Sequence, residues 1–205
     1  MSAERARSTD PRAERVRNRL KAAALDLVHE KRVEDVSVTD VVARAGTSRP
    51  VFYQHFHSRD DAVAAAFAEA VADRLAEDPS TDPVDRIHRV VLYATEHAAL
   101  YANLYPSAVA ERAAEAWREA LLPACEQLAR RAAEERGNGS PVEARYLASF
   151  LVGGLVELGR LWATAPGAVD AGAGRRRAAA DGIVDTCLAV LGVPRQPSPD
   201  ANRPH

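Results

Sequence analysis

Residues 37–56, SVTDVVARAGTSRPVFYQHF, constrain the fold more than any other part of the chain. Ser37 is followed three positions later by Asp40, a spacing typical of the capping box that begins a helix. We therefore predict a short helix from Val38 to Ala45. Gly46 follows it, and glycine tolerates the left-handed backbone conformation in which helices often end.

A second short helix is predicted from Arg49 to Phe56. Ser48 can cap it, and Pro50 lies in its first turn, where a missing N–H does no harm. Phe52 and Phe56 are one turn apart, so both can point inward. Two short helices joined by a glycine-containing turn form a helix-turn-helix.

The other side of this second helix carries polar and small residues, and a short helix with such a face suits the DNA major groove. The outward residues are Arg49, Pro50, Val51, Tyr53, Gln54 and His55. The alternative is a small helical core with incidental polar residues on its surface.

The composition of the 205 residues favours an all-α fold. Alanine, leucine, arginine and glutamate dominate, all of them good helix formers, and β-branched runs bounded by turn residues hardly occur. We expect about nine helices. Those outside the helix-turn-helix are predicted over residues 12–30, 58–76, 82–97, about 110–136, 140–163 and 175–191, with a segment broken by Pro106 between 98 and 110.

Charge is unevenly distributed along the chain, although the net charge is only −2. Residues 1–60 hold twelve Lys and Arg against nine Asp and Glu, whereas the rest holds 15 against 20. A basic first part on an acidic remainder fits DNA contact by one end, and ordinary surface variation is the other explanation.

The sequence also indicates the compartment. Cys125 and Cys187 are the only cysteines and form no CxxC pair, which argues against a disulfide framework or a zinc site. No apolar run reaches the roughly 18–20 residues of a membrane span, and the polar N-terminus does not resemble a signal peptide. We expect a cytoplasmic protein with no membrane contact.

The motifs of common enzyme sites are missing from the sequence. It has no P-loop, no G-x-S-x-G and no paired Glu-x-x-His, of which Asp85 to His88 is only a partial match. Gly172 and Gly174 follow no predicted strand and lack a third glycine, so they do not form a dinucleotide-binding loop. We therefore expect no catalytic residue, no metal and no cofactor, with a helical-bundle enzyme kept as an alternative.

Several residues in and around the predicted helix-turn-helix occur at the spacing of a known family. They are Asp40-Val41-Val42, Ala45-Gly46, Ser48, Tyr53-Gln54-His55-Phe56 and Ser58-Arg59, with Leu20-Lys21-Ala22-Ala23 in the preceding helix. In these residues the chain resembles the tetracycline-repressor (TetR) family of transcriptional regulators, over about residues 14–72. It departs from the family pattern at Lys31-Arg32-Val33, where a glycine is usual, and at Thr47, Pro50 and Arg59.

The resemblance implies two domains. An N-terminal three-helix helix-turn-helix DNA-binding domain would cover 12–57, and a C-terminal helical ligand-binding and dimerisation domain would cover 58–193. Residues 1–11 are expected to be a disordered basic arm and 194–205 a disordered tail.

The family resemblance also suggests which residues contact DNA. It places Arg49, Pro50, Val51 and Tyr53 near bases or the adjoining backbone, where Arg49 could bond guanine and Val51 could pack on a thymine methyl. The other expected contacts are mainly to phosphates, which fix register without specifying sequence. They are Ser37, Thr39, Arg44, Thr47, Ser48, His55 and Arg59.

In the resembled family the last two helices pair with those of a second copy. The dimerisation residues expected on this basis are Leu151, Leu155, Leu158, Trp162, Val184 and Leu188. Packing within one chain explains the same apolar stripe equally well. A homodimer gains support because operators of this class are two-fold and one short helix contacts too few bases.

The resemblance implies a small-molecule site in the C-terminal domain, and such sites are mostly apolar with a few polar groups. The candidate residues are His97, Tyr101, Trp117, Leu121, Phe150 and Glu157, with core packing as the alternative for each. Glu157 lies in a strongly apolar segment. It could pair with a cationic ligand, with Arg160 or Arg145, or reach solvent.

Together these inferences predict a DNA-binding transcriptional regulator. We expect a homodimeric repressor that an unknown small-molecule inducer releases from a double-stranded DNA operator. A ligand-independent DNA-binding regulator or an activator is the alternative within the same class.

Overall fold

The computed structural model describes residues 11–76, 82–135 and 143–193. Within these ranges the regular structure is entirely helical, which confirms the expected all-α fold. The α-helices are α1 (Pro11–Glu30), α2 (Val38–Ala45), α3 (Arg49–His55), α4 (Arg59–Ala76), α5 (Pro83–Glu96), α6 (Ala98–Leu104), α7 (Ala108–Glu135), α8 (Ala144–Ala163) and α9 (Ala173–Leu191). A 3-10 turn, Val33–Asp35, lies between α1 and α2.

The described chain divides into two compact units. The first contains residues 11–70 and Ala102–Ala113, and the second contains Val71–Tyr101 and residues 114–193. Helices α4, α6 and α7 each begin in one unit and end in the other.

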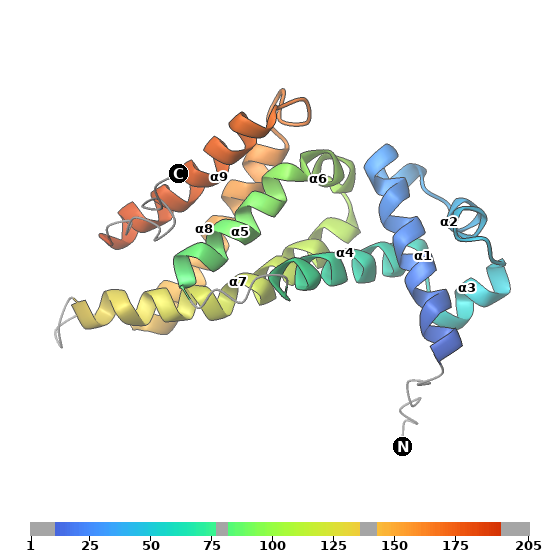
Figure 1. Ribbon diagram of the computed structural model, residues 1–205, viewed down its shortest axis with the longest axis horizontal. Coiled ribbons are helices and arrows are strands. Elements are labelled where there is room, and N and C mark those ends of the chain that lie inside the picture. The colour runs from blue at the N-terminus through green and yellow to red at the C-terminus, as the bar shows by residue number, and fades with distance from the viewer. Residues whose placement is uncertain (1–10, 77–81, 136–142, 194–205) are drawn as a thin grey trace, which may run out of the picture. The chain divides into compact units, whose positions relative to one another are not determined.

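The first unit is built on α1, against which α2 packs, with α3 following α2 (Figure 1). Apolar residues recur along α1 at helical spacing, so that one stripe of the helix is buried. Leu20 and Val28 on this stripe are fully buried, as are Val41 of α2 and Phe52 of α3. The core of the first unit therefore fixes both helices of the helix-turn-helix.

Polar contacts join further elements to α1 within the first unit. Lys21 is only 6% exposed and pairs with Glu69 of α4, because a buried ammonium group needs a charged partner. Asn103 Nδ2 of α6 donates to the Val28 carbonyl oxygen at 2.8 Å. The end of α6 is thereby fixed to the last turn of α1.

In the second unit, α5, α8 and α9 lie side by side (Figure 1). Asp82 caps α5 by accepting from the N–H groups of Val84 and Asp85. His88 Nε2 of α5 lies 2.9 Å from Asp181 Oδ1 of α9, a polar contact between two largely apolar helices.

Several boundaries differ from the prediction. Residues 98–104 form helix α6, where we expected only a segment broken by Pro106. Helix α8 begins at Ala144 after Glu143, and the predicted start at 140–142 lies outside the described residues. The expected tail (194–205) and residues 1–10 of the expected arm also lie outside them.

Helix α8 bears on the expectation that no segment could span a membrane. By length and composition, it is the one helix of the described ranges that is apolar enough to do so. Core helices of globular proteins meet the same criterion. Only 28% of its most apolar window is buried, so much of its apolar surface faces outward.

Candidate nucleic-acid interface

Helix α2 begins as the sequence predicts. Ser37 Oγ accepts from the Asp40 N–H at 3.1 Å, and the Asp40 carboxylate accepts from the Ser37 N–H at 2.9 Å. Lys31 Nζ donates to the same carboxylate at 3.0 Å. These hydrogen bonds, the backbone bond from Ser37 first, lower the pKa of Asp40 to about 2. The capping box is therefore charged and intact at neutral pH.

The turn between α2 and α3 depends on Gly46. Its φ of +62° lies in the left-handed region, and its N–H bonds back to the last turn of α2. The Thr47 N–H also bonds to the Val42 carbonyl oxygen at 2.9 Å. This pair of bonds is the arrangement in which a glycine ends a helix, as predicted.

Helix α3 has a buried and an exposed side. Phe52 and Phe56 are almost completely buried, with ring centroids 5.8 Å apart. Tyr53 is 52% exposed, although its ring contacts Phe52 edge-on. The phenol therefore projects from a helix that the core holds on its other side.

The side chain of Ser48 differs from the prediction. Ser48 has the extended backbone of an N-cap residue, but its hydroxyl accepts no capping hydrogen bond from α3. Pro50, in the first turn, removes one of the N–H donors that a cap would bind.

Arg17 of α1 holds the end of α3, and sequence reasoning missed it. Its Nη1 donates to the His55 carbonyl oxygen at 3.2 Å, and its guanidinium lies over the Phe56 ring, 4.7 Å from the centroid. Burial, and then the nearby Arg17 charge, lower the pKa of His55. The available signal was the position of Arg17, three residues before Leu20 and seven before Ala24, which places it on the apolar side of α1 where a solvated residue is unexpected.

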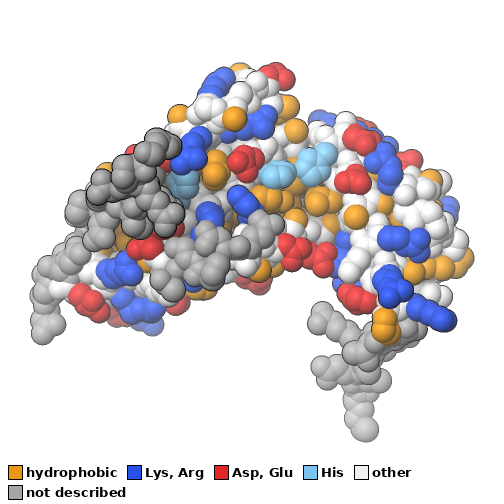
Figure 2. Space-filling model, in the orientation of Figure 1, with side chains coloured by type: hydrophobic (Ala, Val, Ile, Leu, Met, Phe, Trp, Pro, Cys, Tyr) orange, Lys and Arg blue, Asp and Glu red, His pale blue; other side chains and the backbone are white. Residues whose placement is uncertain are grey.

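The structure brings all eleven predicted DNA contacts into the first unit. The exposed ones are Ser37, Thr39, Arg44, Ser48, Arg49, Pro50 and Tyr53, and the half-buried ones are Thr47, Val51, His55 and Arg59. They occupy α2, the turn, α3 and the first residue of α4. Figure 2 shows basic side chains, of arginine or lysine, at the surface of this unit.

Both arginines among the predicted phosphate contacts already have protein partners. Arg44 makes a two-pronged ion pair with Glu30, at 2.8 and 2.9 Å. Arg59 pairs with Asp60 at 2.7 Å and donates to the Val36 carbonyl oxygen at 2.8 Å. Arg49, in contrast, forms no hydrogen bond or ion pair with the described residues.

In the second unit, three of the predicted ligand residues gather around Tyr93 of α5. His97 stacks on Tyr93 with ring centroids 4.0 Å apart. The ring centroid of Trp117 of α7 lies 6.1 Å from that of Tyr93 and 5.7 Å from that of Tyr101 of α6. We call Tyr93, His97, Tyr101 and Trp117 the aromatic cluster.

The other predicted ligand residues are not in this cluster. Leu121 is buried on α7, one turn beyond Trp117. Phe150 and Glu157 are exposed on α8, Phe150 by 63%. Arg160 Nε donates to the Glu157 carboxylate at 2.8 Å and lowers its pKa, so Glu157 pairs with Arg160 and reaches solvent.

Four of the six predicted dimerisation residues pack inside the chain. Leu151 and Leu155 of α8 and Val184 and Leu188 of α9 are each 3% exposed or less. Leu158 and Trp162 are half-buried. The intrachain alternative therefore explains most of this stripe, and the apolar surface that α8 leaves exposed lies elsewhere. It consists of Tyr146, Phe150 and Leu161.

The first unit has the geometry of a helix-turn-helix DNA-binding protein. Residues 20–66 match the family described as bacterial regulatory proteins, TetR family. Residues 20–66 therefore form a DNA-binding domain of this family, and the chain is a DNA-binding transcriptional regulator. No curated protein sequence matches it.

Solved structures show the same fold along most of the chain. GusR of Salmonella enterica has a TM-score of 0.60 at 17% identity, covering 90% of this chain and 98% of its own. A putative TetR-family regulator from Syntrophomonas wolfei has a TM-score of 0.58 at 14% identity, with coverages of 87% and 96%. The fatty acid degradation regulator FadR of Bacillus halodurans has a TM-score of 0.57 at 15% identity, covering 87% of this chain and 99% of its own.

Proposed function

We propose that this regulator is a homodimeric repressor that a small-molecule ligand releases from its DNA operator. Residues 12–57 would form the DNA-binding domain and 58–193 the ligand-binding and dimerisation domain. The observation that carries the proposal is the exposed side of α3. Tyr53 is half exposed there, while the adjacent Phe52 is fully buried.

In this proposal α3 enters the major groove of the operator. Arg49 is the candidate for guanine contact, since it is exposed and has no partner among the described residues. Tyr53 and the first residues of α2 are candidates for the flanking phosphates. In a homodimer, the two α3 helices would enter successive major grooves about 34–36 Å apart.

The dimer is proposed through the outward faces of α8 and α9. Tyr146, Phe150 and Leu161 of α8 are 50–63% exposed, and Val190 of α9 is 57% exposed. Large apolar residues gathered on one helix face mark an interaction surface. Two helix faces about 30 Å long and 10 Å wide would cover about 1,200 Å² over both protomers, enough for a specific interface.

Glycines at the midpoints of both helices support this choice. Gly153 and Gly154 are the central residues of α8, and Gly182 is the central residue of α9. A Cβ at any of them would meet nothing within 4 Å, and none has a positive φ. Glycine inside a helix costs about 1 kcal/mol relative to alanine. The close approach of a second chain gives these glycines a purpose that their own chain does not.

The exposed face of α8 is also symmetric about its glycine pair. Tyr146 and Leu161 are each seven residues from the pair, and Phe150 and Glu157 are each three residues from it. Two antiparallel copies related by a two-fold axis pair residues at equal distances on opposite sides. Tyr146 would then face the partner's Leu161, and Phe150 would face the partner's Glu157.

The aromatic cluster is the proposed ligand site. It contains buried apolar ring faces and the half-buried imidazole of His97, the mixture that suits a small, mostly apolar molecule. Tyr101 of α6 directly precedes Ala102–Ala113, the segment that packs with the first unit. A ligand that orders the cluster would therefore act on helices that continue into the DNA-binding unit.

Duplexes selected from a random-sequence pool by the purified protein test the function. We expect salt-sensitive binding of one two-fold sequence, and increased expression of the neighbouring gene when the regulator is deleted. Absence of any sequence preference at low ionic strength would contradict DNA-binding regulation. A fall in reporter expression on deletion would identify an activator instead.

The ligand site is tested by a thermal-shift screen of small molecules followed by binding to the selected duplex. A true inducer raises Tm and lowers the affinity for DNA. Trp117→Phe should reduce the shift in Tm, whereas Trp162→Phe, the matched change at the other tryptophan, should not. An equal effect of both variants would remove the aromatic cluster from the proposal.

A further inference from the structure

Most arginines of the first unit are already bound within it. Arg17, Arg44 and Arg59 have the partners described above, and Arg112 pairs with Asp61 at 3.1 Å. Among the exposed arginines of α1 and α3, three form no hydrogen bond or ion pair with the described residues. They are Arg15, Arg19 and Arg49. Arg49 belongs to the proposed recognition helix, which leaves two arginines on α1 without an assigned role.

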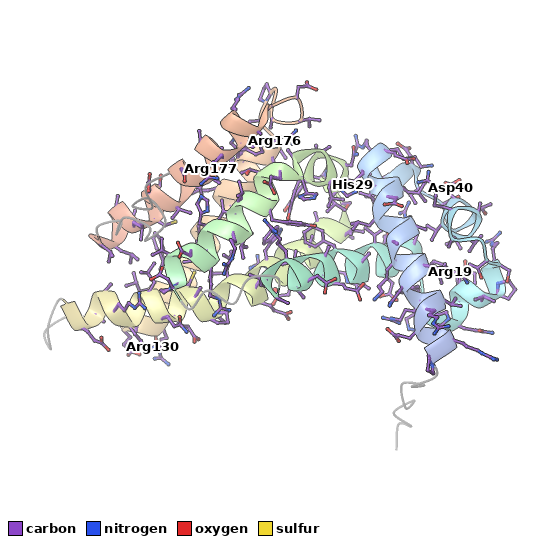
Figure 3. All side chains as sticks on the ribbon, viewed as in Figure 1. Arg19, His29, Asp40, Arg130, Arg176 and Arg177 are labelled. Carbon is purple, nitrogen blue, oxygen red and sulfur yellow. The ribbon has the colours of Figure 1, made fainter. Side chains whose placement is uncertain are left out.

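Arg15 and Arg19 share one side of α1, with Arg12 one turn earlier. We call these three exposed residues the arginine stripe. The same side continues at helical spacing to Glu30, which pairs with Arg44 of α2. The stripe therefore lies on the side of α1 to which α2 packs, and Figure 3 shows Arg19 on that side.

The same turns of α1 also adjoin α3. Arg17 lies two residues from Arg15 and from Arg19, and therefore on the opposite side of α1, where it donates to the His55 carbonyl oxygen at the end of α3. This contact and the packing of α2 against α1 fix the first turns of α1 relative to α3 within one compact unit. The three arginines are exposed, on a helix that the buried core of this unit holds in place.

The sequence of the stripe is unfavourable for an isolated helix. No acidic residue lies three or four positions from Arg15 or Arg19, and the two arginines are themselves four positions apart. Like charges at this spacing destabilise a helix. The acidic residues on this side of α1 are Asp26 and Glu30, in its second half. In the first half, Arg15 and Arg19 are therefore exposed positive charges without an acidic partner among the described residues.

We propose that Arg15 and Arg19 bind backbone phosphates of duplex DNA beside the bases that α3 contacts, with Arg12 extending the contact. This inference rests on the proposed DNA-binding function. Guanidinium groups bind phosphate oxygens with two parallel hydrogen bonds, and such contacts add affinity without specifying sequence. The arginine stripe therefore adds a second, sequence-independent part to the interface.

The test compares salt dependence in two charge-matched variants of the full chain. R15Q/R19Q removes two charges from α1, and R118Q/R130Q removes two from exposed positions on α7. Fluorescence anisotropy with the selected duplex and with a scrambled one gives the slope of log K against log[salt]. We expect the slope of R15Q/R19Q to decrease in magnitude by about 0.9 for each phosphate that the variant no longer neutralises.

Three further results are expected from the same measurements, with R15K/R19K as an additional variant. R118Q/R130Q keeps the wild-type slope, R15K/R19K keeps most of it, and R15Q/R19Q loses affinity equally for both duplexes. If R15Q/R19Q has the wild-type slope, with helical content and mass unchanged, the contact by Arg15 and Arg19 is overturned while the proposed DNA-binding function stands. If the wild-type protein binds neither duplex in a salt-sensitive way, the DNA-binding function fails together with it.

Discussion

Single residues on α3 separate folding from recognition. Phe52 is fully buried, and the next residue, Tyr53, is half exposed. Arg17 binds the helix end from α1 through a hydrogen bond and a cation–π contact. Because the core and Arg17 hold α3 without Tyr53, changes at Tyr53 can alter DNA binding without unfolding the protein.

Tyr53→Ala should lower affinity for the selected duplex by roughly 10- to 100-fold, the worth of one hydrogen bond to a charged group. Thermal unfolding should change little, because the side chain is half exposed. Tyr53→Phe removes the hydroxyl and keeps the ring. Tyr53→Phe and Tyr53→Ala should both bind weakly, because neither side chain can donate a hydrogen bond to phosphate. Normal binding by Tyr53→Ala would mean that α3 does not occupy the groove as proposed.

His55 gives the fold a pH dependence. Burial and the Arg17 charge lower its pKa in the folded state, so the unfolded state binds the proton more readily. The stabilisation is therefore complete above 6.5, the pKa of an unperturbed histidine, and is lost as pH falls through the lowered value. Denaturation midpoints of the wild type should decline more steeply with acid than those of His55→Gln. His57→Gln, at an exposed histidine two positions away, is the matched control for the loss of an imidazole.

At the scale of helices, the sequence predicted where a helix begins and ends better than which of its faces is buried. Helix α2 begins and ends where predicted because its signals, the Ser37–Asp40 box and Gly46, act through neighbouring backbone atoms. Helix α8 is apolar on most sides, so periodicity shows which residues share a face but not which face the chain itself covers. Leu151 and Leu155 are consequently intrachain, and Phe150 is exposed.

Arg17 and α6 show the same limit. The contact of Arg17 with His55 joins residues 38 positions apart, and no local pattern encodes it. Helix α6 has only seven residues, too few to show a clear period before Pro106. What depends on packing between distant segments could not be predicted, whereas caps and turns could.

Replacing glycine by alanine should have opposite effects on stability at Gly46, which ends α2, and at Gly174, which lies in α9. Gly46→Ala should lower the free energy of unfolding by about 1–2 kcal/mol, because a Cβ is disfavoured in the left-handed region. Gly174→Ala lies in the first turn of α9 with open space around it. It should raise stability by up to about 1 kcal/mol, since alanine favours helices. Urea denaturation measures both, and stabilisation by Gly46→Ala would contradict the assigned turn.

At the scale of the whole molecule, affinity for a two-fold operator depends on linking two DNA-binding units. A single short helix contacts few bases, and joining two copies raises overall affinity by about 10²- to 10⁴-fold without any new DNA contact. The exposed face of α8 should therefore matter for DNA binding although none of its residues is proposed to touch DNA.

The symmetric pairing about Gly153 and Gly154 can be tested by charge exchange. Phe150→Glu would place a carboxylate opposite the partner's Glu157, so like charges and weaker apolar packing should give monomers with DNA affinity reduced by about 10²-fold or more. Leu122→Glu, at a residue 40% exposed on α7, is the matched control and should remain dimeric.

Adding Glu157→Lys to Phe150→Glu would pair opposite charges in both halves of the interface. We expect this double variant to recover the dimer in analytical ultracentrifugation and most of the DNA affinity, because the two-fold axis applies each compensation twice. Recovery would establish the antiparallel register, whereas a double variant as monomeric as Phe150→Glu, or a dimer undisturbed by Phe150→Glu, would show that the two copies meet elsewhere.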